Sequence, residues 1–139
     1  MPKLSKTIEK EIEDQQILKA ESRIQQECVT WYRNTFCLKH HNPRCMILSI
    51  PNESNEAKAA QLINTGLYPG AGDFGLIHAK GWCTDIVFIE IKTPENRTGP
   101  KKNGQSKKQI EFEEHCKQMG IPYFLVRSKE EFCQVVESL

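Results

Sequence analysis

Asp73-Phe-Gly-Leu-Ile-His-Ala-Lys-Gly-Trp-Cys-Thr-Asp-Ile-Val-Phe-Ile-Glu-Ile-Lys92 is the stretch that decides the fold of this 139-residue chain. Its second half, residues 84–91, is rich in β-branched and aromatic residues, which favour β-strands. Gly81 and Trp82 interrupt this pattern, and Gly81 can adopt the positive φ that a tight turn requires. The stretch therefore predicts two antiparallel strands joined by a turn at Gly81 and Trp82.

Three charged side chains are predicted to meet at the open end of this hairpin. With the turn at its tip, Asp73 lies opposite Glu90. Because side chains alternate along a strand, Glu90 and Lys92 share one face, and the other face holds Ile89 and Ile91. Charged groups at the edge of an apolar core require partners. A divalent cation would explain the two carboxylates, and an anionic substrate would explain the lysine.

The composition predicts one soluble domain. Hydrophobic residues make up 38% of the chain and charged residues 27%, which is the usual balance of a globular protein. No apolar run approaches the roughly 18 residues of a membrane span, and the polar N-terminus does not resemble a signal peptide, so no membrane contact is expected. The six cysteines are scattered, with no Cys-x2-Cys pair, which predicts a reducing, cytoplasmic compartment.

Positive charge is concentrated in one loop. The formal net charge is only +1, yet residues 92–109 contain six Lys or Arg against one Glu. The segment 93–105 is also rich in Gly, Pro and Asn, and it is long for a loop in a compact domain, which favours a functional or mobile loop. A solvated loop is one interpretation. Its position directly after Glu90 and Lys92 favours contact with an anionic partner.

Two helices are expected before the hairpin. Residues 2–20 form a polar helix or a partner-binding arm, with a narrow apolar stripe that includes Ile8 and Ile12. Residues 20–38 form a second helix, whose apolar face also contains Glu21, whereas Glu27 lies towards the edge of that face. Glu21 is therefore the better candidate for a functional carboxylate. A first-turn glutamate stabilised by the helix dipole is the alternative.

The rest of the chain completes an α/β pattern. Strands are predicted at 46–50 and 121–126, and helices at 56–65, 106–119 and 128–139. The succession of strand, crossover helix and strand predicts that residues 121–126 join the sheet parallel to residues 84–91. We divide the chain into an N-terminal helical arm, residues 1–19, and a domain, residues 20–139.

Two local patterns allow more than one interpretation. Ser106-Lys-Lys-Gln109 matches a capping box, so Gln109 either caps the helix or supports the charged site. A second pattern contains potential zinc ligands, but its spacing matches no usual structural zinc site, and the end of a helix is the better interpretation. Its residues are Cys37, His40, His41 and Cys45.

An Asp, a hairpin and then Glu-x-Lys resemble the PD-(D/E)XK nuclease superfamily. The wider order of motifs is similar to its VRR-NUC branch, which includes small phage and bacterial nucleases. The resemblance extends over residues 20–139 and implies a restriction-endonuclease-like fold, a mixed β-sheet core flanked by helices. Two departures are Ala71-Gly72, where members often have proline before the Asp, and the absence of a basic residue shortly after Asn52-Glu53. The matching pieces are Glu21-Ser-Arg-Ile-Gln25, Ile50-Pro-Asn-Glu53, Gly66, Pro69-Gly-Ala-Gly-Asp73, Phe88-Ile-Glu-Ile-Lys-Thr93, Ser106-Lys-Lys-Gln109 and Gly120-Ile-Pro-Tyr-Phe-Leu-Val-Arg-Ser-Lys-Glu-Glu-Phe132.

The resemblance implies a metal-dependent catalytic site. Its catalytic residues are Asp73, Glu90, Lys92 and Gln109. Its ligands for Mg²⁺ or Mn²⁺ are Asp73, Glu90, the Ile91 carbonyl and Glu21. Lys92 would orient the attacking water or stabilise charge on the phosphate. Hard oxygen ligands of this kind suit Mg²⁺.

The resemblance also implies DNA as the partner. Basic residues after the site would bind flanking phosphates, which gives salt-sensitive affinity with little sequence information. The predicted nucleic-acid-binding residues are Asn52, Arg97, Lys101, Lys102, Lys107 and Lys108.

We therefore predict a Mg²⁺-dependent DNA endonuclease that is structure-selective, like a Holliday-junction resolvase. By analogy it would act on branched or junction DNA as a homodimer, in the cytoplasm of a bacterial or phage-infected cell. A general nuclease, or one directed at flaps or nicks, is the alternative among enzymes. A non-catalytic nucleic-acid-binding module on the same fold is the alternative outside enzymes.

Overall fold

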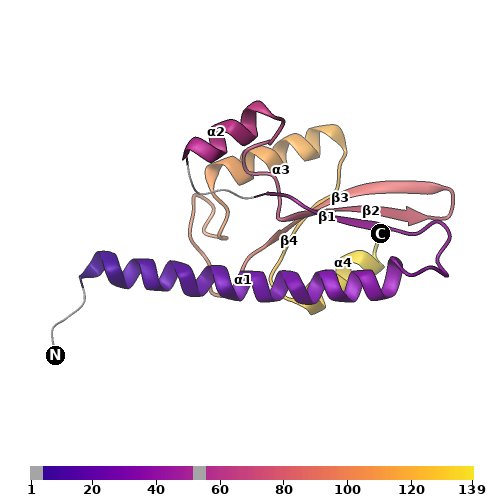
Figure 1. The fold of residues 1–139 in the computed structure, drawn as a ribbon, viewed down its shortest axis with the longest axis horizontal. Helices are drawn as coiled ribbons and strands as arrows, with labels where there is room; N and C mark the ends of the chain where they lie inside the picture. Colours follow the sequence, from indigo (N-terminus) through magenta and orange to yellow (C-terminus); the bar gives the residue numbers. More distant parts are fainter. Residues whose placement is uncertain (1–4, 52–55) are drawn as a thin grey trace.

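A computed structural model describes residues 5–51 and 56–139. Its helices and strands alternate in the order that the sequence predicts, except at the N-terminus (Figure 1). The elements are α1 (Lys6–Phe36), β1 (Met46–Ser49), α2 (Glu56–Asn64), β2 (Phe74–Lys80), β3 (Cys83–Ile91), α3 (Lys107–Met119), β4 (Tyr123–Val126) and α4 (Lys129–Glu137).

The strands form one mixed sheet in the order β1-β2-β3-β4. Strands β1, β2 and β3 are antiparallel neighbours, and β4 pairs with β3 in parallel. In the hairpin, Phe74 pairs with Ile89, which confirms the predicted register, and Gly81 at the turn has a φ of 60°. The parallel pairing of β4 confirms the predicted crossover through α3, and the whole is the α/β fold that the sequence predicts.

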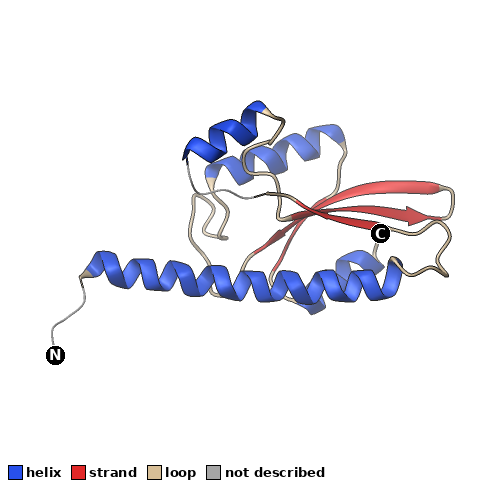
Figure 2. Ribbon diagram, in the orientation of Figure 1, coloured by secondary structure: helices blue, strands red, loops and turns tan. Residues whose placement is uncertain are grey.

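The main core lies on one face of the sheet. Alternate side chains of β2 and β3, including Phe74 and Ile89, are fully buried there. They pack against α1, through Cys28 and Tyr32, and against α4, where the Phe132 ring meets Phe74 edge to face with a centroid distance of 5.6 Å. Figure 2 shows α1 and α4 on this side of the sheet, and α2 and α3 on the other.

The opposite face of the sheet holds the charged residues. Phe88 points to this face, and its ring meets Phe112 of α3 edge to face at 5.0 Å. Because side chains alternate along β3, Glu90 lies on the same face as Phe88, under α2 and α3. Helix α3 begins with the predicted capping box at Ser106 and ends at Gly120 in the left-handed conformation. These caps set where α3 begins and ends, and its first turn lies beside the charged end of the hairpin.

The N-terminal segment differs from the prediction. The two helices expected over residues 2–20 and 20–38 are a single helix, α1, of 31 residues. No proline or glycine stands within it to break the ladder of hydrogen bonds. At 1.5 Å per residue it is about 46 Å long, and its first half extends beyond the sheet (Figure 1). The division into an arm, residues 1–19, and a domain, residues 20–139, stays a prediction.

Three further observations concern the surface, the thiols and the helices. Met119 is exposed in the last turn of α3. All six cysteines are free thiols. None of the helices in the described part of the chain is both long enough and apolar enough to cross a membrane.

Candidate active site

Asp73 is hydrogen-bonded to β3 through both its backbone and its side chain. Its amide donates to the Ile89 carbonyl at 2.8 Å, and its Oδ2 accepts from the Ile91 amide at 2.6 Å. Gly72 makes this approach possible, because a Cβ there would lie only 2.6 Å from the Ile89 carbonyl oxygen. The Asp73 carboxylate is therefore held at the open end of the hairpin, next to the end of β3.

Glu90 is the most enclosed charged residue of the site. Its side chain is almost fully buried, with 1% of the residue exposed. Its Oε1 accepts from the Gln109 amide nitrogen at 2.8 Å and lies 3.3 Å from the Lys92 ammonium. Its Oε2 is buried without a hydrogen-bond partner among the described residues. A buried carboxylate oxygen without a partner is costly, and a bound cation would compensate for that cost.

Burial raises the pKa values of both carboxyls. The pKa of Glu90 rises from 4.5 to about 8, first because of desolvation and second because of the negative charge of Asp73, while Lys92 opposes the rise. The pKa of Asp73 is also raised by desolvation, against the Ile91 amide and Lys92. Glu90 therefore keeps its proton near neutral pH, and additional positive charge at the site would favour the ionised form of both carboxyls.

Gln109 satisfies both interpretations of its sequence position. Its side-chain oxygen accepts from the backbone amide of Ser106 at 2.8 Å, and its backbone amide donates to the Ser106 hydroxyl at 3.3 Å. The same side chain donates through Nε2 to Glu90. Because the oxygen is committed to the helix cap, the nitrogen must face the carboxylate. The capping box thus orients the group that holds Glu90.

Glu21 approaches the site, whereas Glu27 does not. Glu21 Oε1 accepts from the Asn96 side chain at 3.3 Å, and its negative charge contributes to the raised pKa of both Asp73 and Glu90. Glu27 is exposed and lies beside Trp31 and Lys129 in a shallow surface groove.

The described residues contain no group of three or more His, Cys, Asp or Glu side chains that could hold a metal ion. Glu21 therefore does not complete a three-carboxylate cluster with Asp73 and Glu90. The same finding applies to the cysteines and histidines between residues 37 and 45, so no zinc group forms there.

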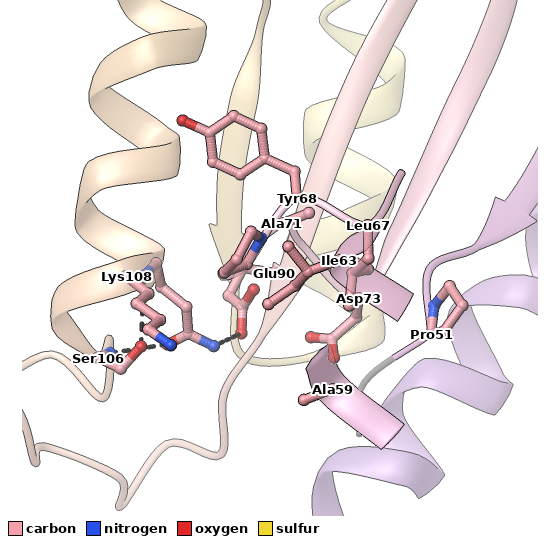
Figure 3. A pocket seen from close by; sticks show the side chains of 13 residues that line it. Pro51, Ala59, Ile63, Leu67, Tyr68, Ala71, Asp73, Glu90, Ser106 and Lys108 are labelled. Atoms are coloured by element: carbon pink, nitrogen blue, oxygen red, sulfur yellow. Dashed lines mark hydrogen bonds between the residues drawn. The ribbon is translucent and has the colours of Figure 1, made fainter. Parts of the chain in front are cut away.

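The carboxylates of Asp73 and Glu90 open onto a cavity of about 200 Å³ (Figure 3). Helix α2, the turn before β2 and the first turn of α3 surround it. Of the predicted nucleic-acid-binding residues that the structure describes, Lys108 lines this cavity. The basic residues Arg97, Lys101, Lys102 and Lys107 are exposed and do not line it. Asn52 lies outside the described residues.

Arg127 organises the basic loop, a role that the sequence pattern does not predict. Its guanidinium donates to the carbonyls of Thr93 at 2.7 Å, Asn96 at 3.0 Å and Asn103 at 2.7 Å. One side chain thus joins three points of the loop for which the sequence predicts mobility or function. The order of the predicted elements does contain a signal for this role. Arg127 directly follows residues 121–126, which are predicted to run parallel to β3, so Arg127 lies beside the point where the loop leaves β3.

A second buried network closes the end of this loop. Gln105 donates through Nε2 to the Glu113 carboxylate at 2.7 Å and to the Tyr123 hydroxyl at 3.2 Å. Burial raises the pKa of Tyr123, and the charge of Glu90 adds to the rise. At Gly104 a Cβ would lie 3.0 Å from Cδ of Lys92, so the loop passes directly over the aliphatic part of that lysine. No local pattern in the sequence indicates this network.

Comparison with solved structures identifies a protein chain titled "VRR_NUC domain". The similarity covers 85% of the present chain and 95% of that chain, with a TM-score of 0.53 and 20% sequence identity. No protein-family model matches the sequence, and no curated protein matches it. At this level of identity the likeness concerns the fold. The chain therefore has the fold of a VRR_NUC domain, as the resemblance in its sequence predicted.

Proposed function

We propose that this protein is a metal-dependent DNA endonuclease, a hydrolase of phosphodiester bonds. One observation supports the proposal above the others: the buried Glu90 lies beside the half-buried Asp73 and next to Lys92, and Glu90 Oε2 has no partner among the described residues. The fold of a VRR_NUC domain supports the same conclusion. A purely structural role would not explain why two raised-pKa acids open onto a cavity.

Mg²⁺ or Mn²⁺ fits the donor set of this site. Asp73 and Glu90 would hold the ion, with the Ile91 carbonyl as a further oxygen ligand predicted from the resemblance. Glu21, which the resemblance also implies as a ligand, forms no carboxylate cluster with them in this structure and would support the ion through its negative charge. The bound ion supplies positive charge for the transition state and a water of lowered pKa.

The protein's own residues would then position the reactants. Gln109 holds Glu90 Oε1 and leaves Oε2 without a partner among the described residues. Lys92 lies 3.3 Å from the same Oε1 and would orient the attacking water or neutralise charge on the phosphate. Lys108, at the positive end of the α3 dipole, would bind a phosphate in the cavity.

We propose branched or junction DNA as the preferred substrate, cut in the cytoplasm. This preference rests on the likeness to small resolvases that the sequence motifs suggest. A four-way junction is resolved by two symmetric cuts, so the proposal includes a homodimer.

The test compares cleavage of a four-way junction, a flap and a plain duplex, each in Mg²⁺, in Mn²⁺ and in EDTA. We expect paired cuts in the junction that require the metal. Lys92→Ala should lose cleavage while it retains most of its DNA binding. Lys117→Ala, an exposed lysine at the other end of α3, is the matched control and should cleave normally.

Three results would change the proposal. Equal cutting of all three DNAs would replace the resolvase with a general nuclease. Binding without cleavage in either metal would replace the enzyme with a nucleic-acid-binding module. Full activity of Lys92→Ala would remove this lysine from the catalytic group.

A further inference from the structure

Tyr68 is an aromatic residue at the edge of the catalytic cavity that the proposed reaction does not use. Its side chain helps to line the cavity that contains Asp73 and Glu90, yet 43% of the residue is exposed. Figure 3 shows its ring beside Ala71, with the hydroxyl directed away from both carboxylates. The ring therefore borders the site without taking part in its charge network.

The position of this ring is fixed from two sides. The Tyr68 hydroxyl shares a hydrogen bond with Nδ1 of His115 at 3.0 Å, and the ring packs edge to face on Phe112 with a centroid distance of 5.0 Å. Two residues later, Gly70 has a φ of 79° and approaches α3 so closely that a Cβ would collide with the Lys108 carbonyl. Tyr68 is thus held at a constant place relative to the first turn of α3.

An apolar hollow continues from the catalytic cavity at Tyr68. It has a volume of about 490 Å³, within the usual range of small-ligand sites. Leu67, Tyr68 and Ala71 line both spaces, and Phe88 and Phe112 line the hollow alone. One side of the combined space therefore offers carboxylates, a lysine and a helix N-terminus, and the other side offers flat apolar surfaces.

This division matches the chemistry of a nucleotide. The phosphate of a nucleotide is anionic and suits Lys108 and a metal-binding carboxylate pair. A nucleobase is planar and has a π-face, which aromatic side chains bind by stacking irrespective of sequence. The continuity of the hollow with the cavity places the base beside the phosphate that would be cut.

We propose that Tyr68 stacks on an unpaired nucleobase of the substrate, which enters the hollow formed with Phe88 and Phe112. The inference rests on the proposed nuclease function and specifies its substrate: DNA that offers an unpaired base next to the scissile phosphate. In a plain duplex the base is paired and must first leave the stack at an energetic cost. Branched or bulged DNA avoids part of that cost, which gives a physical basis for structural selectivity.

The experiment measures binding by the full-length chain in EDTA, so that the DNA stays intact. The probes are two end-labelled duplexes, one with a single unpaired 2-aminopurine bulge and one with an abasic residue at the same bulge. Fluorescence anisotropy gives the dissociation constants. We expect the wild type to bind the 2-aminopurine bulge about 5- to 150-fold more tightly than the abasic bulge, as stacking on one aromatic side chain predicts.

The variants separate stacking from a structural role. Tyr68→Ala and Tyr68→Leu should abolish the preference for the base and weaken abasic binding little, and Tyr68→Leu retains apolar contact with Phe112. Tyr68→Phe keeps the ring and should keep the preference. Trp82→Ala removes a fully exposed aromatic residue at the hairpin tip and is the matched control. Bound 2-aminopurine should be quenched in every protein that retains an aromatic ring at position 68.

Several outcomes would overturn the inference. They are an absence of DNA binding, equal wild-type affinity for the two bulges, and an equal loss of affinity for both bulges in the Tyr68 variants. Junction cleavage in Mg²⁺ is scored separately. Cleavage without a base preference would reject only the stacking site, and a base preference without cleavage in any metal would reject only the nuclease.

Discussion

The two carboxylate oxygens of Glu90 have different surroundings. Gln109 and Lys92 both contact its Oε1, whereas Oε2 is buried without a partner among the described residues. A structural ion pair would be expected to satisfy both oxygens. The asymmetry leaves one oxygen available to a cation.

We expect the metal-free protein to lose stability as the pH rises from about 5 to 8. The pKa of Glu90 is raised from 4.5 to about 8, so within this window the folded protein keeps a proton that the unfolded chain has released. Each pH unit should then lower the free energy of unfolding by roughly 1.4 kcal/mol for this group. Urea denaturation in EDTA at a series of pH values measures the slope.

Glu90→Gln cannot titrate and should reduce that slope, whereas Glu111→Gln, on the exposed side of α3, should leave it unchanged. Mg²⁺ should stabilise the wild type more at pH 8 than at pH 6, because the ligand must be ionised to bind the ion. The same slope in wild type and Glu90→Gln would contradict the assignment.

Glu21 and Glu27 offer a second comparison between matched residues on one helix. Glu21 is near enough to the site to affect the pKa of Asp73 and Glu90, and Glu27 is exposed elsewhere. We expect Glu21→Gln to reduce cleavage at limiting Mg²⁺ by about 10- to 100-fold, the usual effect of a group that supports a metal site. Glu27→Gln should have little effect, and equal losses would show that the helix face does not matter.

The turn into β2 depends on close backbone contact. We expect Gly72→Ala to lower the free energy of unfolding by roughly 1–3 kcal/mol, because a Cβ would lie 2.6 Å from the Ile89 carbonyl oxygen. At Gly75, within β2, an added Cβ would meet no atom closer than 3.8 Å, so Gly75→Ala should be neutral or slightly stabilising. Urea denaturation distinguishes them, and an equal cost would mean that strand propensity rather than contact decides.

The basic loop depends on Arg127, which donates to three of its carbonyls. We expect Arg127→Gln to increase the rate of limited trypsin cleavage at Arg97, Lys101 and Lys102. Loss of about 1.5 kcal/mol from one charge-assisted hydrogen bond would raise the open population about tenfold. Lys129→Gln removes a nearby basic residue outside the loop and serves as the control. An unchanged cleavage rate would show that other contacts hold the loop.

At the scale of the whole molecule, α1 extends beyond the domain that it packs against. Ile8 and Ile12 lie one helical turn apart on the projecting half and are 45% and 42% exposed. We expect the protein to be a homodimer in solution through this stripe, as two symmetric cuts in a junction require. Light scattering after size exclusion should give a dimer for the wild type and for Lys10→Asp, and a monomer for Ile8→Asp combined with Ile12→Asp. A monomeric wild type at every concentration would contradict this expectation.

The sequence alone determined the features that depend on residues close together in the chain. The turn at Gly81 and the alternation along 84–91 were enough to predict the hairpin register and the shared face of Glu90 and Lys92. The capping box at Ser106 was predicted for the same reason, because it depends on hydrogen bonds within one helical turn. The ordered motifs together predicted the fold that the structural comparison shows.

Only the tertiary structure decided which distant groups meet at the site. The contacts of Arg127 with the loop, the approach of Glu21 to Asp73 and the enclosure of Gln105 each join segments far apart in the chain. Such contacts depend on how α1, α3 and β4 pack on the sheet, which no local pattern specifies. Glu90 Oε2 belongs to the same class, because its lack of a hydrogen-bond partner among the described residues follows from everything that packs around it. Local hydrogen-bonding chemistry can be read from neighbouring residues, whereas burial and its effect on a pKa are properties of the assembled core.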